Sequence, residues 1–253
     1  MPRNVERALI IVTLVGSLGY LAQQHWPASA AAAAAAGGID GTVRLTGTPP
    51  PNALIRMGAD PNCLQANAGK RVTQDAVVVN PNGTLRNVFV HLTGSVPGAS
   101  SPPSQPIVID QNGCVYHPRV AAARVGQAFQ VVNSDNTLHN IHSHGGDVFN
   151  VGQPRAGMKS DFTLKSEGVL FLRCDVHPWL VGYVGVASHP YFGVTGADGA
   201  FHLANVPPGH YTLEAWHERF GILTQAVDVT ASGPVKADFS YTGTEKAPPP
   251  PGN

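Results

Sequence analysis

Beyond residue 38, no stretch of this 253-residue chain offers three turns of helical periodicity. Apolar and polar residues alternate instead, in short runs that are rich in β-branched side chains and are interrupted by Asn-Gly and Pro-Gly pairs. This alternation is typical of strands whose two faces meet different surroundings. The pattern predicts strands over 41–47, 76–79, 85–94, 106–110, 121–133, 161–174 and 180–187. Short strands without helices between them predict an all-β sandwich or barrel.

A second set of strands follows His189-Pro190, where we place a domain boundary. Its predicted strands cover 201–203, 211–216, 226–229 and 235–241. A unit of about fifty residues is small for an independent core, so we expect it to pack on the first unit. The proline-rich residues 244–253 are predicted to form a disordered, solvated tail.

Residues 1–30 have the features of an export signal. Two arginines precede an apolar run over 8–22, which is shorter than the roughly 20 residues of a membrane-spanning helix. Ala28-Ser29-Ala30 then supplies a small-residue cleavage site. The alternative is an uncleaved membrane anchor, tethered through an Ala/Gly linker over 31–38. With either start, we expect the folded part to be periplasmic or secreted.

The charge balance argues against a nucleic-acid partner. The 16 Lys+Arg residues equal the 16 Asp+Glu residues, so no basic surplus is present to neutralise phosphates. Removal of residues 1–30 leaves 14 basic and 15 acidic groups, a net charge of −1.

The three cysteines divide into a pair and a single residue. Cys63 and Cys114 lie beside turn residues, in DPNC and QNGC. Two loop cysteines in an exported protein predict a disulfide. Cys174 is left over at the end of an apolar strand. It can be a buried inert thiol, one half of an intermolecular bridge or a metal ligand.

The neighbours of Cys174 favour the metal ligand. Cys174 and His177 form C-x-x-H after one predicted strand, and His139 follows another in LHNIH. Strand ends of one sandwich can bring such groups together, and a thiolate with two imidazoles is a set that suits copper. His142 and His144 are either a second copper site or solvent-facing loop residues, and we favour the loop interpretation.

Residues 120–187 resemble the cupredoxins, the small blue copper proteins, and most closely their amicyanin-like and plastocyanin-like members. The resemblance rests on VGQAFQVVNSD, LHNIH and CDVHPWL. It implies a Greek-key sandwich over 39–188 that holds one copper ion. It assigns the metal to three ligands, His139, Cys174 and His177. It also implies that Asn140 ties the two ligand loops together.

One position departs from the family pattern. Short-loop members carry C-x-x-H-x-x-Met, and the methionine is a weak axial ligand, but this chain has Leu180 there. Leucine cannot coordinate, so we expect a three-coordinate copper or an unexpected axial donor. We also expect the second ring nitrogen of His139 to be fixed by an inner hydrogen bond.

Residues 189–243 resemble the transthyretin-like, carboxypeptidase-regulatory-like sandwich module, on the segment DGAFHLANVPPGHYTLEAW. Such modules have structural or interaction roles. GTVRLTGTPPPNA, near the start of the folded part, resembles their opening strand. The boundary between the two units is therefore expected to be less clean than a single cut at 188/189.

These features predict an exported mononuclear copper protein that carries single electrons and is not an enzyme. The sequence has no G-x-S-x-G, no H-E-x-x-H, no P-loop and no dinucleotide-binding glycine pattern. The alternatives are a non-redox extracytoplasmic copper-binding or interaction protein and a copper oxidoreductase. His177 is the expected electron exit if its ring edge reaches an apolar surface. Trp179 either lines such a surface, where a redox partner would dock, or is an ordinary core residue. The redox partner is not identified by the sequence, and the near-zero net charge favours apolar contact over charge steering.

Overall fold

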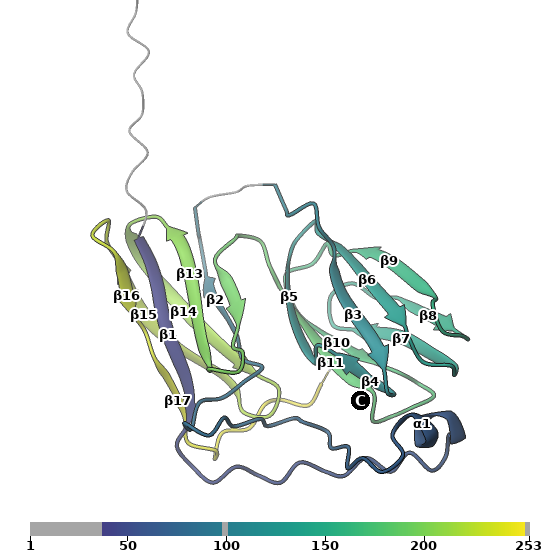
Figure 1. The fold of residues 1–253 in the computed structure, drawn as a ribbon. Helices are drawn as coiled ribbons and strands as arrows, with labels where there is room; N and C mark the ends of the chain where they lie inside the picture. Colours follow the sequence, from purple (N-terminus) through teal and green to yellow (C-terminus); the bar gives the residue numbers. More distant parts are fainter. Residues whose placement is uncertain (1–36, 98–100, 251–253) are drawn as a thin grey trace, which may run out of the picture. The chain divides into compact units, whose positions relative to one another are not determined.

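The structure, a computed structural model, describes residues 37–97 and 101–250 (Figure 1). The regular structure of these residues is β apart from one short helix, α1 (Pro61–Ala66). The first strands are β1 (Gly37–Leu45), β2 (Phe89–Thr93), β3 (Ile107–Asn112), β4 (Val115–His117), β5 (Val120–Arg124) and β6 (Ala128–Asn133). Next come β7 (His139–His144), β8 (Asn150–Gln153), β9 (Lys159–Thr163), β10 (Gly168–Arg173) and β11 (Val181–Ala187). The last are β12 (Phe192–Val194), β13 (Ala200–Val206), β14 (Gly209–His217), β15 (Gly221–Val229), β16 (Pro234–Lys236) and β17 (Phe239–Tyr241). The predicted all-β class is confirmed.

Four of the predicted strands differ from the structure, and one of them, 235–241, divides into β16 and β17. The stretches 121–133 and 161–174 each divide into two strands, β5 with β6 and β9 with β10. In the first case Gly126 has a φ of +85°, a left-handed conformation that ends an extended strand. The stretch 76–79 forms only an isolated bridge, in which Val79 pairs with Leu85.

Strands β3 to β11 form two sheets, which we call the central sandwich. One sheet has the order β5-β11-β10-β7-β8 and the other the order β4-β3-β6-β9. Alternate residues of β6 point inward, among them the fully buried Phe129 and Val131. They pack with Ile109 of β3 and Leu172 of β10 in one apolar cluster. The period-two pattern of the sequence is therefore the pattern of this core.

The remaining strands, β1, β2 and β12 to β17, form a second pair of sheets, the flanking sandwich. Strand β1 pairs antiparallel with β13 and in parallel with β16 and β17. Strand β2 lies between β12 and β14. Strand pairing therefore departs from the predicted boundary at 188/189, because residues 37–45 and 89–93 complete the sheets of the later unit. A less clean boundary was expected, because GTVRLTGTPPPNA resembles the opening strand of a transthyretin-like module.

Gly41 explains how β1 fits between its neighbours. A Cβ at this position would lie 1.9 Å from the Ala237 carbonyl oxygen and 2.4 Å from the Phe201 ring. Both are far below contact distance, so only glycine permits β1 to approach the strands on either side.

Strand β11 is buried on both faces. On its outer side Tyr183 packs with Val120 and Phe171, and its ring centroid lies 5.0 Å from that of Trp216 in β14. Gly185 leaves room for the Phe89 ring of β2, since a Cβ there would lie 2.5 Å from it. The central sandwich therefore contacts strands of the flanking sandwich through β11.

Helix α1 begins at a strong N-cap. The Asp60 side chain accepts hydrogen bonds from the backbone N–H groups of Asn62 and Cys63, and Pro61 follows the cap. Asn67, just beyond the helix, donates from Nδ2 to the carbonyls of Cys63 and Gly113, both at 2.9 Å. These contacts fasten α1 to the β3–β4 turn.

The predicted signal over 1–30 and most of the linker over 31–38 lie outside the described residues, and Gly37 and Gly38 belong to β1. No helix in 37–97 or 101–250 is long and apolar enough to cross a membrane. Residues 244–250 carry no strand, but the Ala247 N–H donates to the Arg219 carbonyl at 3.1 Å. This part of the predicted tail is therefore hydrogen-bonded to the folded chain.

Candidate metal centre

The structure brings the three predicted ligands together at one end of a sheet. His139 is the first residue of β7, Cys174 follows the last residue of β10, and His177 lies in the loop before β11. Strand β10 pairs with both β7 and β11, so their ends are neighbours. The loop is closed by two backbone hydrogen bonds, from Cys174 N–H to the Leu180 carbonyl and from Leu180 N–H to the His177 carbonyl.

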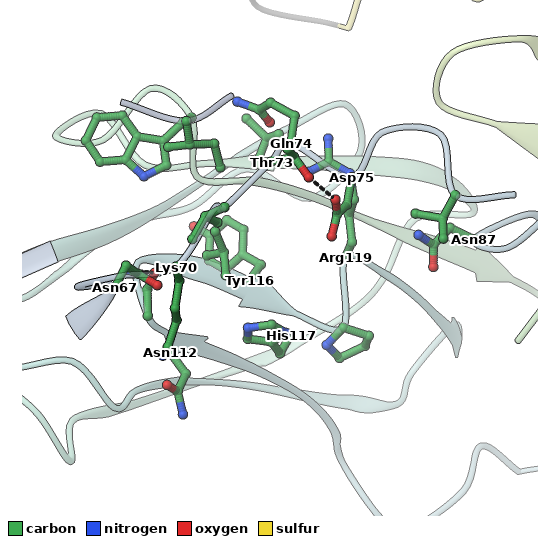
Figure 2. Close-up of a pocket in the computed structure, with 18 of the residues that line it drawn as sticks. Asn67, Lys70, Thr73, Gln74, Asp75, Asn87, Asn112, Tyr116, His117 and Arg119 are labelled. Carbon is green, nitrogen blue, oxygen red and sulfur yellow. Dashed lines mark hydrogen bonds between the residues drawn. The ribbon is translucent and has the colours of Figure 1, made fainter. Parts of the chain in front are cut away.

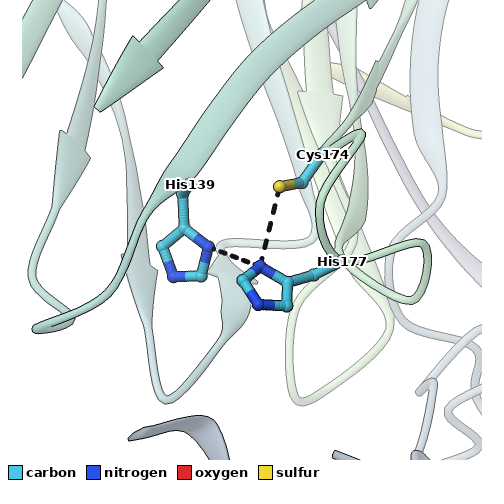
Figure 3. Close-up of side chains that lie close together, drawn as sticks. All are labelled: His139, Cys174 and His177. Atoms are coloured by element: carbon cyan, nitrogen blue, oxygen red, sulfur yellow. Dashed lines mark hydrogen bonds between the residues drawn. The ribbon is translucent and has the colours of Figure 1, made fainter. Parts of the chain in front are cut away.

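The donor atoms face one another (Figure 3). The Cys174 Sγ lies 3.7 Å from the His177 Nδ1, and the two imidazole Nδ1 atoms are 3.0 Å apart. All three candidate ligand atoms lie within 4.8 Å of one another. Protein sulfur and nitrogen ligands stand about 2.0–2.3 Å from an ion, which separates two ligands by roughly 3–4 Å. The cluster therefore has the size of a site for one ion.

Electrostatics favours the metal-binding form of the cysteine. Burial by itself raises the pKa of Cys174, but hydrogen bonds with His139, His177 and the Asn140 N–H lower it to about 6. Burial lowers the pKa of His139, and hydrogen bonds with Asp135 and the thiolate raise it to about 9. A thiolate is thus favoured at neutral pH, and the thiolate is the form that ligates metals.

Each imidazole has a carboxylate on its far nitrogen. The His139 Nε2 lies 2.9 Å from Asp135 Oδ2, and the His177 Nε2 lies 3.0 Å from Asp60 Oδ2. The inner partner expected for His139 is therefore a buried aspartate. Sequence reasoning missed both carboxylates. Asp60 followed by proline is an N-cap signature that could have been recognised, whereas Asp135 in NSDN resembles any turn residue.

Asn140 connects the two ligand segments, as the resemblance implied. Its Oδ1 accepts the Asp175 N–H at 2.7 Å, and its Nδ2 donates to Asp175 Oδ2 at 2.9 Å. Its own N–H donates to the Cys174 Sγ at 3.4 Å. One residue thus links β7 to the cysteine loop.

Leu180 is fully buried beside the cluster. Its side chain has no donor atom, so it supplies no axial ligand. Met57, although buried, accepts a hydrogen bond at Sδ from Asn67 Nδ2 at 3.1 Å.

The predicted disulfide between Cys63 and Cys114 is present, with Cα atoms 5.6 Å apart. It lies beside the candidate site, because the Cys63 Sγ is 3.7 Å from the His177 Nε2. Each half-cystine also belongs to a second group of candidate metal-binding side chains, one with Asp60 and His177 and one with Asp135 and His139. The disulfide removes both sulfurs as thiolate ligands and leaves Cys174 as the free cysteine.

The prediction that His142 and His144 lie in a solvent-facing loop is wrong. Both residues belong to strand β7. Their ring centroids are 4.1 Å apart, and the His142 Nδ1 is 3.0 Å from Asp175 Oδ2. Burial, with the neighbouring charge of His142, lowers the pKa of His144. Among the described residues they belong to no group of three candidate metal-binding side chains.

His177 was expected to be the electron exit only if its ring edge reaches the surface. The ring edge does not reach the surface. The side chain is only 2% exposed. Its outward neighbour is the half-buried Trp179, with ring centroids 5.1 Å apart. Trp179 donates from Nε1 to the Cys114 carbonyl at 3.1 Å.

Trp179 also lines a pocket of about 450 Å³. Figure 2 shows this pocket, with Lys70, Asp75 and Arg119 among the labelled side chains. The pocket carries charges of both signs, from Lys70, Arg86 and Asp75. Arg119 also lines it, but its guanidinium is bound by Glu218. The pocket lies next to the candidate metal centre, with Trp179 between the two.

No family model matches the sequence, and no curated protein matches it. Several solved structures resemble part of the chain. A purple cupredoxin from Nitrosopumilus maritimus is 29% identical over 32% of this chain and 99% of its own, with a TM-score of 0.29. An oxidised amicyanin variant is 22% identical over 37% of this chain and 97% of its own, with a TM-score of 0.30.

A copper-containing nitrite reductase from Thermus scotoductus is 20% identical over 38% of this chain, with a TM-score of 0.32. This chain spans 25% of that enzyme's length. The likeness to these three proteins is confined to 32–38% of the chain. The function is therefore inferred from the chemistry of the candidate site.

Proposed function

We propose that this protein is an exported carrier of single electrons that holds one copper ion between His139, Cys174 and His177. The observation that carries the proposal is the buried convergence of one cysteine sulfur and two imidazole nitrogens. A trigonal set of two histidines and a cysteine is the ligand set of electron-transfer copper sites. Copper bound there would supply the exchange of one electron.

The ligand segments are held by hydrogen bonds within the protein. The backbone bonds between Cys174, His177 and Leu180 close the cysteine loop. Asn140 fastens that loop to β7 through both atoms of its side-chain amide. Donor groups positioned in advance move little when the charge at the site changes, and small motion favours rapid electron exchange.

Contact with a redox partner is assigned to the surface at Trp179. This indole is the partly exposed ring that packs on the buried His177. The nearby side chains of Lys70, Arg86 and Asp75 have mixed charge, which supports recognition by shape and apolar contact.

An extracytoplasmic location is supported by two features. The disulfide between Cys63 and Cys114 suits an oxidising compartment. The basic and apolar start of the sequence, over 1–30, suits an export signal.

The test is a copper titration of the purified protein, followed by visible absorption. We expect one equivalent of copper to give an intense visible band that bleaches on reduction and returns on oxidation. The Cys174→Ser variant should lose the band, and the Cys63→Ser/Cys114→Ser double variant, which alters the other cysteines, should keep it. Tight binding without the band would contradict the proposal and favour a non-redox copper-binding protein. Substrate turnover by the copper-loaded protein would favour an oxidoreductase.

A further inference from the structure

His177 is covered by the carboxylate of Asp60, the N-cap residue that immediately precedes helix α1. Its Nε2 lies 3.0 Å from Asp60 Oδ2, and only 2% of the side chain is exposed. The other carboxylate oxygen, Oδ1, accepts the N–H groups of Asn62 and Cys63, at 2.8 and 3.1 Å. The carboxylate therefore holds the start of the helix with one oxygen and the imidazole with the other.

The same carboxylate is fixed from a third direction. The Thr137 hydroxyl donates to Asp60 Oδ2 at 2.7 Å, and Thr137 is two residues before His139. Asp60 thus joins helix α1, the segment that leads into β7 and the loop that carries His177. A side chain with four such partners has little freedom to turn away from the imidazole.

The contact at His139 repeats this arrangement with different residues. The N–H groups of Gly113 and Cys114 donate to Asp135 at 2.7 and 2.8 Å, and Asp135 Oδ2 lies 2.9 Å from the His139 Nε2. The disulfide joins the two arrangements, because Cys63 supplies an N–H to one carboxylate and Cys114 supplies an N–H to the other.

We propose that Asp60 is a positioning residue that locks His177 into the metal site, and that the Cys63–Cys114 disulfide fastens the helix that carries it. This inference rests on the proposed copper site. The carboxylate keeps the proton of the imidazole on Nε2 and turns Nδ1 toward Cys174 and His139. Carboxylate partners on the far nitrogen fix the ring orientation and raise the basicity of a ligating imidazole. With the helix in place, His177 cannot swing out to release a bound ion.

The main test variant is Asp60→Asn. Asparagine caps a helix as well as aspartate does, so α1 is expected to remain folded, while the negative charge at the imidazole is lost. The matched control is Asp238→Asn, because Asp238 also accepts a backbone N–H and a hydroxyl, both from Thr42 in the flanking sandwich.

The first readout is the rate at which the Cu(I) chelator bicinchoninate removes copper from the protein loaded with Cu(I). Loss of such a partner typically weakens metal binding by about 10–100-fold, and we expect release from Asp60→Asn to accelerate in that range. The Cys63→Ser/Cys114→Ser variant should release faster than wild type, and Asp238→Asn should match wild type.

The second readout needs no metal. In ¹⁵N spectra of the histidine rings of the metal-free protein, wild type should show His177 protonated at Nε2. Asp60→Asn should move the His177 signals and leave those of His139 in place. Unchanged release and unchanged His177 signals would overturn the inference. Failure of every variant and of wild type to bind copper would instead refute the proposed function, and the ring spectra would still decide the role of Asp60.

Discussion

At the scale of single residues, Leu180 sets the expected electronic character of the site. It is fully buried and offers no donor atom, at the position where the cupredoxins that the sequence resembles carry an axial methionine. Cu(II) gains more than Cu(I) from an additional donor, so the leucine should favour Cu(I) and raise the reduction potential. We expect Leu180→Met to lower the potential by about 60 mV or more, equivalent to tenfold in the one-electron equilibrium. Protein-film voltammetry measures it, and a potential in the variant that equals or exceeds that of wild type would contradict this assignment.

His217, at the end of β14, is a second residue with a measurable effect. It is fully buried, its Nδ1 accepts the Arg219 N–H, and its Nε2 has no hydrogen-bond partner among the described residues. Burial, and then the charge of Arg119, lowers its pKa from 6.5 to about 3. Below pH 6.5 this histidine is protonated in the unfolded chain but stays neutral in the folded chain. The free energy of unfolding is therefore greatest above pH 6.5 and falls as the pH decreases toward 3.

Between pH 6.5 and pH 3, the free energy of unfolding is expected to fall by about 1.4 kcal/mol per pH unit, the value for one linked proton. Urea unfolding of wild type and His217→Asn at several pH values measures it. The asparagine can accept the same N–H but does not titrate, so its stability should depend less steeply on pH. Equal slopes for the two proteins would rule out His217 as the source.

At the scale of elements, β1 and β2 show what sequence patterns can and cannot predict. Their alternation predicted strands. Elsewhere in the chain, the predicted strand ends next to His139 and Cys174 suggested that His139, Cys174 and His177 would meet, and the structure brings these three side chains together. The partners of β1 and β2 follow them by more than 90 residues, and such long-range pairing has no local periodicity to reveal it. The six-residue helix α1 is likewise too short for a periodic signal, so its carboxylate contact with His177 was not foreseen.

A fragment that contains only residues 189–253 should therefore not fold. It lacks β1, which lies between β13 and β16, and β2, which lies between β12 and β14. It also loses fully buried residues such as Ile39, Val90 and Leu92, each of which contributes about 1.5–3 kcal/mol by burial. Amide proton spectra should show the narrow dispersion of an unfolded chain. A well-dispersed spectrum from the fragment alone would show that the two early strands are dispensable.

At the scale of the whole molecule, charge gives little long-range direction to association. Residues 31–253 carry 14 basic and 15 acidic groups, and the charged side chains around the pocket at Trp179 have both signs. Exposed charges more than about 10 Å apart are screened at 0.1 M salt. We expect the self-exchange of electrons between two copies, measured by NMR line broadening, to change little with ionic strength. A steep change would indicate charge steering.

The central claim is that one copper ion is bound by His139, Cys174 and His177. X-ray absorption at the copper edge counts its ligands directly. We predict one sulfur and two imidazole nitrogens, with distances that change little between Cu(I) and Cu(II), and loss of the sulfur in Cys174→Ser. A copper ion without a sulfur ligand in wild type, or with a sulfur ligand that survives in Cys174→Ser, would contradict the account.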